Sequence, residues 1–127
     1  MQKGYIALIT VLIVMAVVLT TASTVALLAI GEAQSGFSLF KGDEVLSFVD
    51  GCAEDAMLKA RADPNYNGGI ITRPEGSCAI TIVSKVGSPI VTWTIRATTE
   101  ATLYKRAVEI VFNRAPTGIT LTSYKEI

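Results

Sequence analysis

The sequence predicts an α+β protein in which a long N-terminal helix packs on a four-stranded antiparallel sheet. Three observations predict this fold. An uncharged apolar run begins near residue 1, an amphipathic helical pattern follows it, and apolar and polar residues alternate through the last part of the chain. Within the 127 residues, these patterns place a helix at 5–30, its continuation at 31–63 and a sheet domain at 64–127.

The first helical segment is apolar on every side, and it contains no charged residue between Lys3 and Glu32. At the standard helical rise, residues 5–30 span roughly 39 Å. A bilayer core requires about 20 apolar residues, so this segment is long enough to cross a membrane. Its few hydroxyl side chains can bond to backbone carbonyls one turn earlier, as membrane helices tolerate. They are Thr10, Thr20, Thr21, Ser23 and Thr24.

A secretory signal is an alternative interpretation of the same run. Such signals end in a site of small residues, and Thr20-Thr21-Ala22 offers one. However, apolar residues resume at once from Val25 to Ile30. A secreted binding domain cleaved after Ala22 therefore stays open beside a membrane-anchored protein.

The helix becomes amphipathic after the apolar run. From Lys41 to Ala62 one apolar stripe repeats at helical spacing, and Asp63-Pro64 then ends the helix. The stripe comprises Val45, Phe48, Val49, Cys52, Ala53, Ala56 and Ala60. Because glycine weakens a helix by up to about 1 kcal/mol, we expect a bend or local loosening near Gly31 to Gly42.

Residues 64–77 are rich in Gly, Pro and Asn and predict a loop. Alternating β-branched and aromatic residues then predict four half-buried strands. The strand patterns cover 78–83, 91–97, 108–112 and 119–122. Turn signals separate them at 86–89, 99–101 and 115–118, and such short connections favour an antiparallel meander. One face of this sheet would cover the helix stripe.

The two cysteines allow two interpretations. Cys52 lies in the helix stripe and Cys78 on the expected inner face of the first strand. A disulfide between them would close a loop of about 26 residues, worth very roughly 3 kcal/mol. Two buried free thiols are the alternative.

The composition offers little for catalysis or nucleic-acid binding. Eleven basic and eleven acidic residues balance, and there is no histidine. Neither a nucleophile-base pair, a metal-ligand spacing nor a phosphate-binding loop stands out. Trp93 and Tyr104 are expected in the core or on the sheet. We therefore expect neither an enzyme nor a cofactor or metal site.

The start of the chain resembles a known family. Met1-Gln2-Lys3-Gly4, followed by Tyr5 and a long uncharged helix, is similar to the class III leader of type IV prepilins and pseudopilins. The resemblance implies that Lys3 supplies the leader charge and that a prepilin peptidase cleaves between Gly4 and Tyr5. Tyr5 would then be N-methylated and the helix retained. Other pilin or pseudopilin subunits would be the partners.

The same resemblance implies a location and a role. The subunit would wait in the cell membrane with its domain outside, and then enter a cell-surface filament or a periplasmic pseudopilus. Major pilins carry Glu at the fifth mature position, where this chain has Ile9. In lacking this Glu, the chain resembles some minor pilins and the minor pseudopilins at filament tips. A single-span anchored domain that never polymerises remains the alternative.

Overall fold

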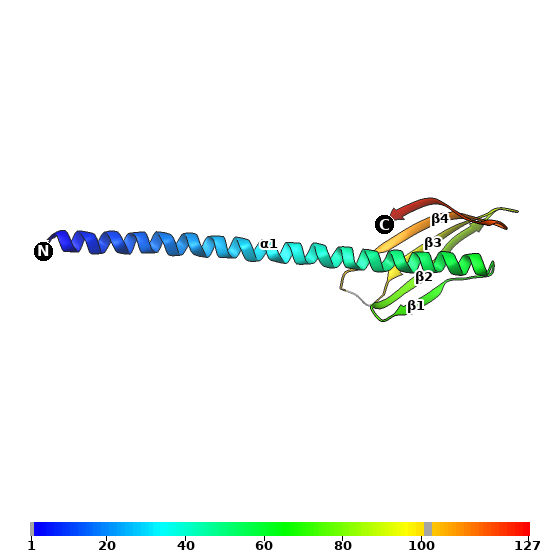
Figure 1. The fold of residues 1–127 in the computed structure, drawn as a ribbon, viewed down its shortest axis with the longest axis horizontal. Coiled ribbons are helices and arrows are strands. Elements are labelled where there is room, and N and C mark those ends of the chain that lie inside the picture. Colours follow the sequence, from blue (N-terminus) through cyan, green and yellow to red (C-terminus); the bar gives the residue numbers. More distant parts are fainter. Residues whose placement is uncertain (1, 101–102) are drawn as a thin grey trace. The chain divides into compact units, whose positions relative to one another are not determined.

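The computed structural model describes residues 2–100 and 103–127. One helix precedes five strands, so the fold is α+β as the sequence predicts (Figure 1). The elements are α1 (Gln2–Ala62), β1 (Gly69–Arg73), β2 (Gly76–Val86), β3 (Val91–Thr99), β4 (Ala107–Ala115) and β5 (Gly118–Glu126). The chain forms two compact units, which divide between Leu39 and Phe40.

The first unit consists of helix alone. Helical structure continues without a break through Gly31 and Gly36, so the expected loosening of the helix was wrong at these positions. A single glycine removes a side chain but keeps its backbone N–H and C=O groups, and the hydrogen-bond ladder of α1 therefore tolerates it. The price of each glycine is only about 1 kcal/mol of helix stability.

In the second unit, the last part of α1 covers one face of the sheet. The predicted stripe forms the contact: Val49, Cys52, Ala53, Ala56 and Ala60 are all buried. Three of these positions carry the small side chain of alanine. The sheet contributes larger side chains, of which Trp93 and Phe112 stack with ring centroids 5.9 Å apart. The other buried core residues are Ile71, Cys78, Ile80, Ile95, Ala97, Val108 and Ile110.

The sheet has five strands, and the expectation of four was wrong. All neighbours are antiparallel in the order β1-β2-β3-β4-β5. The additional strand is β1, which lies inside the segment expected to be a loop and pairs with the start of β2. Only one side chain of β1, Ile71, is buried. Apolar and polar residues therefore do not alternate along this strand, and its sequence does not predict it. Pairing with β2 and contact of Arg73 with the helix stabilise it instead.

Strands β2, β3 and β4 follow the predicted alternation, whereas no residue of β5 is buried. In β3 the buried side chains Trp93, Ile95 and Ala97 face α1, whereas the intervening threonines and Arg96 face away. The loop between β3 and β4 is closed by Thr99, whose backbone N–H donates to the Arg106 carbonyl at 3.1 Å. Of the turn expected at residues 99–101, Ala101 lies outside the described residues.

Candidate functional site

The apolar part of α1 is the largest candidate functional surface. Every residue from Gln2 to Phe40 is exposed, and large apolar side chains lie on all sides of the helix. A helix that is apolar all round requires lipid or protein around it. Among the described residues, α1 is the one helix long and apolar enough to cross a membrane. Membrane anchoring is thus compatible with this segment.

The hydroxyl groups of this segment are satisfied within the helix. Thr20 donates to the carbonyl of Val17 at 2.9 Å, and Thr24 donates to that of Thr20 at 2.8 Å. Thr10, Thr21 and Ser23 make the same kind of bond to a carbonyl three or four residues earlier. With these bonds made, the hydroxyls carry little cost in lipid.

Lys3, Gly4 and Tyr5 lie in the first turns of α1 and are exposed. A Cβ added at Gly4 would meet no atom within 4 Å. The fold therefore places no steric demand for glycine at this position, and any such demand must come from a molecule that contacts it. Met1, the first residue of the predicted leader, lies outside the described residues. Ile9 lies one turn after Tyr5 and presents an aliphatic side chain.

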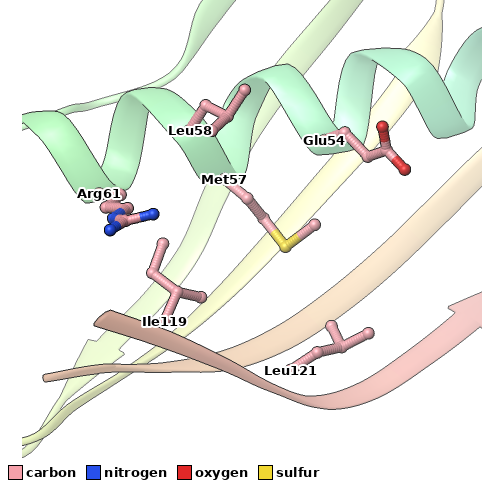
Figure 2. Close-up of a pocket in the computed structure, with 6 residues that line it drawn as sticks. All are labelled: Glu54, Met57, Leu58, Arg61, Ile119 and Leu121. Atoms are coloured by element: carbon pink, nitrogen blue, oxygen red, sulfur yellow. The ribbon is translucent and has the colours of Figure 1, made fainter. Parts of the chain in front are cut away.

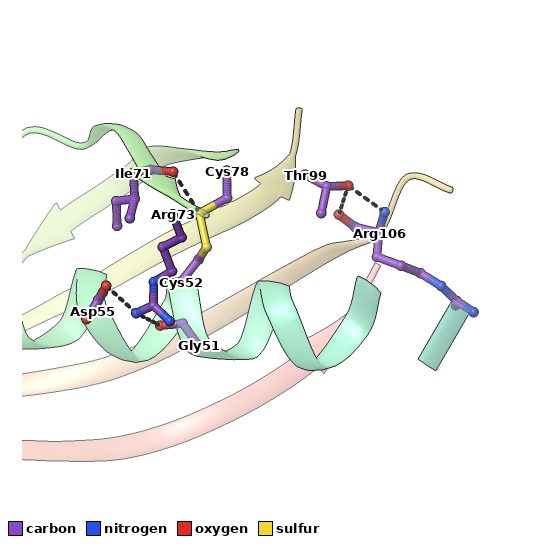
Figure 3. Close-up of a disulfide and its surroundings, with 8 residues drawn as sticks. All are labelled: Gly51, Cys52, Asp55, Ile71, Arg73, Cys78, Thr99 and Arg106. Carbon is purple, nitrogen blue, oxygen red and sulfur yellow. Dashed lines mark hydrogen bonds and ion pairs between the residues drawn. A yellow bond between two sulfur atoms is a disulfide. The ribbon is translucent and has the colours of Figure 1, made fainter. Parts of the chain in front are cut away.

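The cysteines form a disulfide, and the alternative of two free thiols was wrong. Cys52 of α1 and Cys78 of β2 are bonded, with their Cα atoms 6.6 Å apart, and both are fully buried (Figure 3). Arg73 lies beside the bond on β1, where it donates to the Asp55 carboxylate and to the Gly51 carbonyl. The hydrogen bond to Asp55, helped by its negative charge, raises the pKa of Arg73.

One further contact joins the last strand to the helix, and a second joins it to the residue that precedes β4. Tyr124 of β5 donates its hydroxyl proton to the Asp50 carboxylate of α1. Burial, that hydrogen bond and the nearby negative charges of Asp50 and Glu126 raise the pKa of Tyr124 to about 12. Arg106 forms an ion pair with Glu126 at the end of the same strand.

Sequence reasoning missed a groove between α1 and β5. It has a volume of about 420 Å³ and is lined by apolar side chains between Glu54 and Arg61 (Figure 2). The apolar lining is Met57, Leu58, Ile119 and Leu121. The apolar pattern of the helix does not distinguish Met57 and Leu58 from its other apolar residues. They line a groove with β5 only because the tertiary fold brings that strand alongside the helix.

Among the described residues, no group of three or more His, Cys, Asp or Glu side chains is placed to hold a metal ion. Comparison with protein-family models, with curated proteins and with solved structures gives no match to this chain. Any function must therefore be argued from the chain's own residues and their arrangement.

Proposed function

We propose that this protein is a structural subunit of a type IV pilus or of a pseudopilus-like filament. The observation that carries the proposal is the helix α1, whose apolar first part continues directly into the amphipathic part that holds a small sheet domain. The leader-like residues Lys3, Gly4 and Tyr5 stand at the start of that helix. A prepilin peptidase would cleave after Gly4, and Tyr5 would become the N-terminus.

Assembly would exchange one apolar environment for another. The apolar part of α1 starts in lipid and then packs against the helices of neighbouring subunits. Because lipid and protein are similarly apolar, close packing must supply the gain. Ala16, Ala22 and Ala26 permit close approach of helix backbones. Gly31 is a further small residue on this helix. Glycine weakens the helix, and no contact within this chain requires it, because a Cβ added there would meet no atom within 4 Å. Its small size would instead serve packing against a neighbouring helix.

The proposed role is that of a minor or tip subunit. A carboxylate at the fifth mature position attracts the N-terminal amine of a neighbour, but Ile9 carries no charge and cannot make this attraction. A subunit without that attraction is suited to be the first one added, or to be held sparsely by its sheet domain. Before assembly it would reside in the cell membrane with the sheet domain outside.

Two other functions would use the same sequence differently. A membrane-anchored surface domain would keep the apolar helix in lipid and never polymerise. A secreted binding domain would lose the helix up to Ala22. The first alternative requires lipid-compatible residues in the apolar part of α1 but places no limit on their size.

The substitution Ala22→Leu distinguishes a filament subunit from a plain anchor. Leucine is at least as apolar as alanine, so membrane insertion should be unchanged. Its larger side chain should prevent close helix approach, and the amount of this chain in sheared filaments should fall several-fold. Leu27→Ile, which conserves volume, is the matched control. Equal recovery of Ala22→Leu and the control in filaments would contradict close packing at this position.

A further inference from the structure

Strand β5 is an edge of the sheet with one free side. It pairs with β4 alone, and residues Thr120 to Glu126 are exposed. Such an edge has backbone N–H and C=O groups available for another strand. Side chains of an added strand would alternate between the two faces of the sheet, as those of β5 do.

The apolar groove lies along the helix-facing side of this edge. Ile119 and Leu121 belong to β5, while Met57 and Leu58 come from α1 and close the other side (Figure 2). Leu58 is 62% exposed and Leu121 is 52% exposed, so the groove is open to a partner. A volume of about 420 Å³ lies within the range of ligand sites, roughly 300–1,000 Å³.

A cationic pocket adjoins the groove where β5 begins. This pocket of about 120 Å³ is lined by Arg61, Arg114 and the turn from Ala115 to Gly118. Arg61 also lines the groove, so the two hollows share a wall. A water molecule occupies about 30 Å³ in the liquid, and the pocket therefore has room for a carboxylate.

The two guanidinium groups lack an acidic partner among the described residues. Arg114 donates to the helix-end carbonyls of Ala60 at 2.9 Å and Arg61 at 3.4 Å. The side chain of Arg61 has no hydrogen bond or ion pair with any described residue. Two like charges beside a polar hollow favour an anion there, because a carboxylate accepts bonds from guanidinium N–H groups.

The charged groups nearby do not cancel this effect. Glu54 lines the far end of the groove, seven residues before Arg61 and therefore roughly 10 Å away along the helix. The Asp63 carboxylate accepts a hydrogen bond from the backbone N–H of Asn65 at 2.8 Å. Lys59 is exposed and adds positive charge on the same turn of α1 as Arg61.

We propose that this edge binds the free C-terminus of a partner polypeptide that ends in an aliphatic residue. The peptide would add to β5 as an antiparallel strand. Running opposite to β5, it would end beside Gly118, where Arg61 and Arg114 receive its terminal carboxylate. The last side chain would enter the groove at Ile119 and Met57. Strand addition to a sheet edge and capture of a terminal carboxylate are both known modes of peptide recognition.

The test uses the full chain in detergent micelles with ¹³C-methyl-labelled methionine. The probe is an N-acetylated pentapeptide of alternating threonine and valine that ends in leucine with a free carboxylate. Met57 lines the groove and reports binding, whereas Met15 lies in the apolar helix and reports non-specific partitioning into the micelle. We expect a saturable shift of the Met57 methyl with a dissociation constant of about 1 mM or tighter, and no saturable shift of Met15.

Two control peptides examine the chemistry of the site. A C-terminal carboxamide removes the charge and should weaken binding about tenfold or more, because charge-assisted hydrogen bonds are lost. N-methylation of alternate amides removes strand donors and should weaken binding likewise. Equal affinity of the acid and the amide would overturn the role of the arginines, and equal affinity of the N-methylated peptide would overturn strand addition.

Variants examine the residues. Arg61→Gln removes a side chain with no internal partner, so the fold should persist while affinity falls about tenfold or more. Lys59→Gln removes the same charge from the same turn of α1 outside the pocket and should bind almost as the unaltered protein does. The proposal is wrong if Arg61→Gln and Lys59→Gln bind equally, or if no saturable Met57 shift occurs with the free acid.

Discussion

Cys52 of α1 and Cys78 of β2 are joined through the centre of the core, where both residues are fully buried. The bond closes a loop with a sequence separation of 26, which includes the end of the helix and all of β1. The bond lowers the conformational entropy of the unfolded chain. Because the sheet domain is small, the resulting stabilisation is a large part of the free energy of unfolding of that domain.

Loss of the disulfide should destabilise the second unit. We expect Cys52→Ser to lower the free energy of unfolding by about 3 kcal/mol, chiefly because the unfolded chain gains freedom. Chemical denaturation in detergent, followed by the fluorescence of the single Trp93, measures this change. Reducing the unaltered protein should give a similar loss. Reaction of either thiol with an alkylating agent in non-reduced protein would contradict the bond.

Gly68 should be required for the connection between α1 and β1. Its φ of 81° is unfavourable for other residues, and an added Cβ would lie 2.3 Å from the Ile80 carbonyl oxygen. Gly68→Ala should therefore lower the free energy of unfolding by about 1–3 kcal/mol. The neighbouring exposed position supplies a control, since Asn67→Ala should change stability by less than about 0.5 kcal/mol. Equal stability of the two variants would contradict the strained geometry of this turn.

The contact of Tyr124 with Asp50 should make stability fall at alkaline pH. In the folded protein the pKa of Tyr124 is raised to about 12, whereas an unperturbed tyrosine has a pKa of 10.0. Because the pKa is raised on folding, the contribution of this contact to the free energy of unfolding is complete below pH 10 and is lost as the pH rises toward 12. Tyr124→Phe should flatten that part of the curve of unfolding free energy against pH. An unchanged slope in the variant would show that another group titrates there.

Parts of this fold could be predicted from sequence because their signals are local. Alternation of apolar and polar residues revealed β2 to β5, and in β2, β3 and β4 it reflects one buried face. The helical stripe placed Cys52 toward the sheet. Strand β1 gave no such signal, because only Ile71 is buried in its five residues. The groove and cationic pocket were missed for a different reason. Arg61 and Arg114 are 53 residues apart and meet only because β4 returns alongside the end of α1.

The aliphatic residue at position 9 should limit how much of this chain enters filaments. We expect it in small numbers relative to a partner subunit with the carboxylate, as quantitative mass spectrometry of sheared filaments would show. Ile9→Glu should raise that share if it supplies the missing attraction, although an unpaired carboxylate in lipid costs about 3 kcal/mol on insertion scales. Ile9→Gln, which is polar without charge, is the control. Dominance of the unaltered chain in filaments would contradict the minor role.

The mass of the mature N-terminal peptide tests the central proposal most directly. Processing as a prepilin predicts a chain that begins at Tyr5 and carries one methyl group on its amine. Gly4→Val should leave the precursor uncut, although a Cβ added there meets no atom within 4 Å in the fold. An N-terminus at Ser23, or an intact Met1 in the mature protein, would contradict the proposal that this chain is a pilin-like subunit.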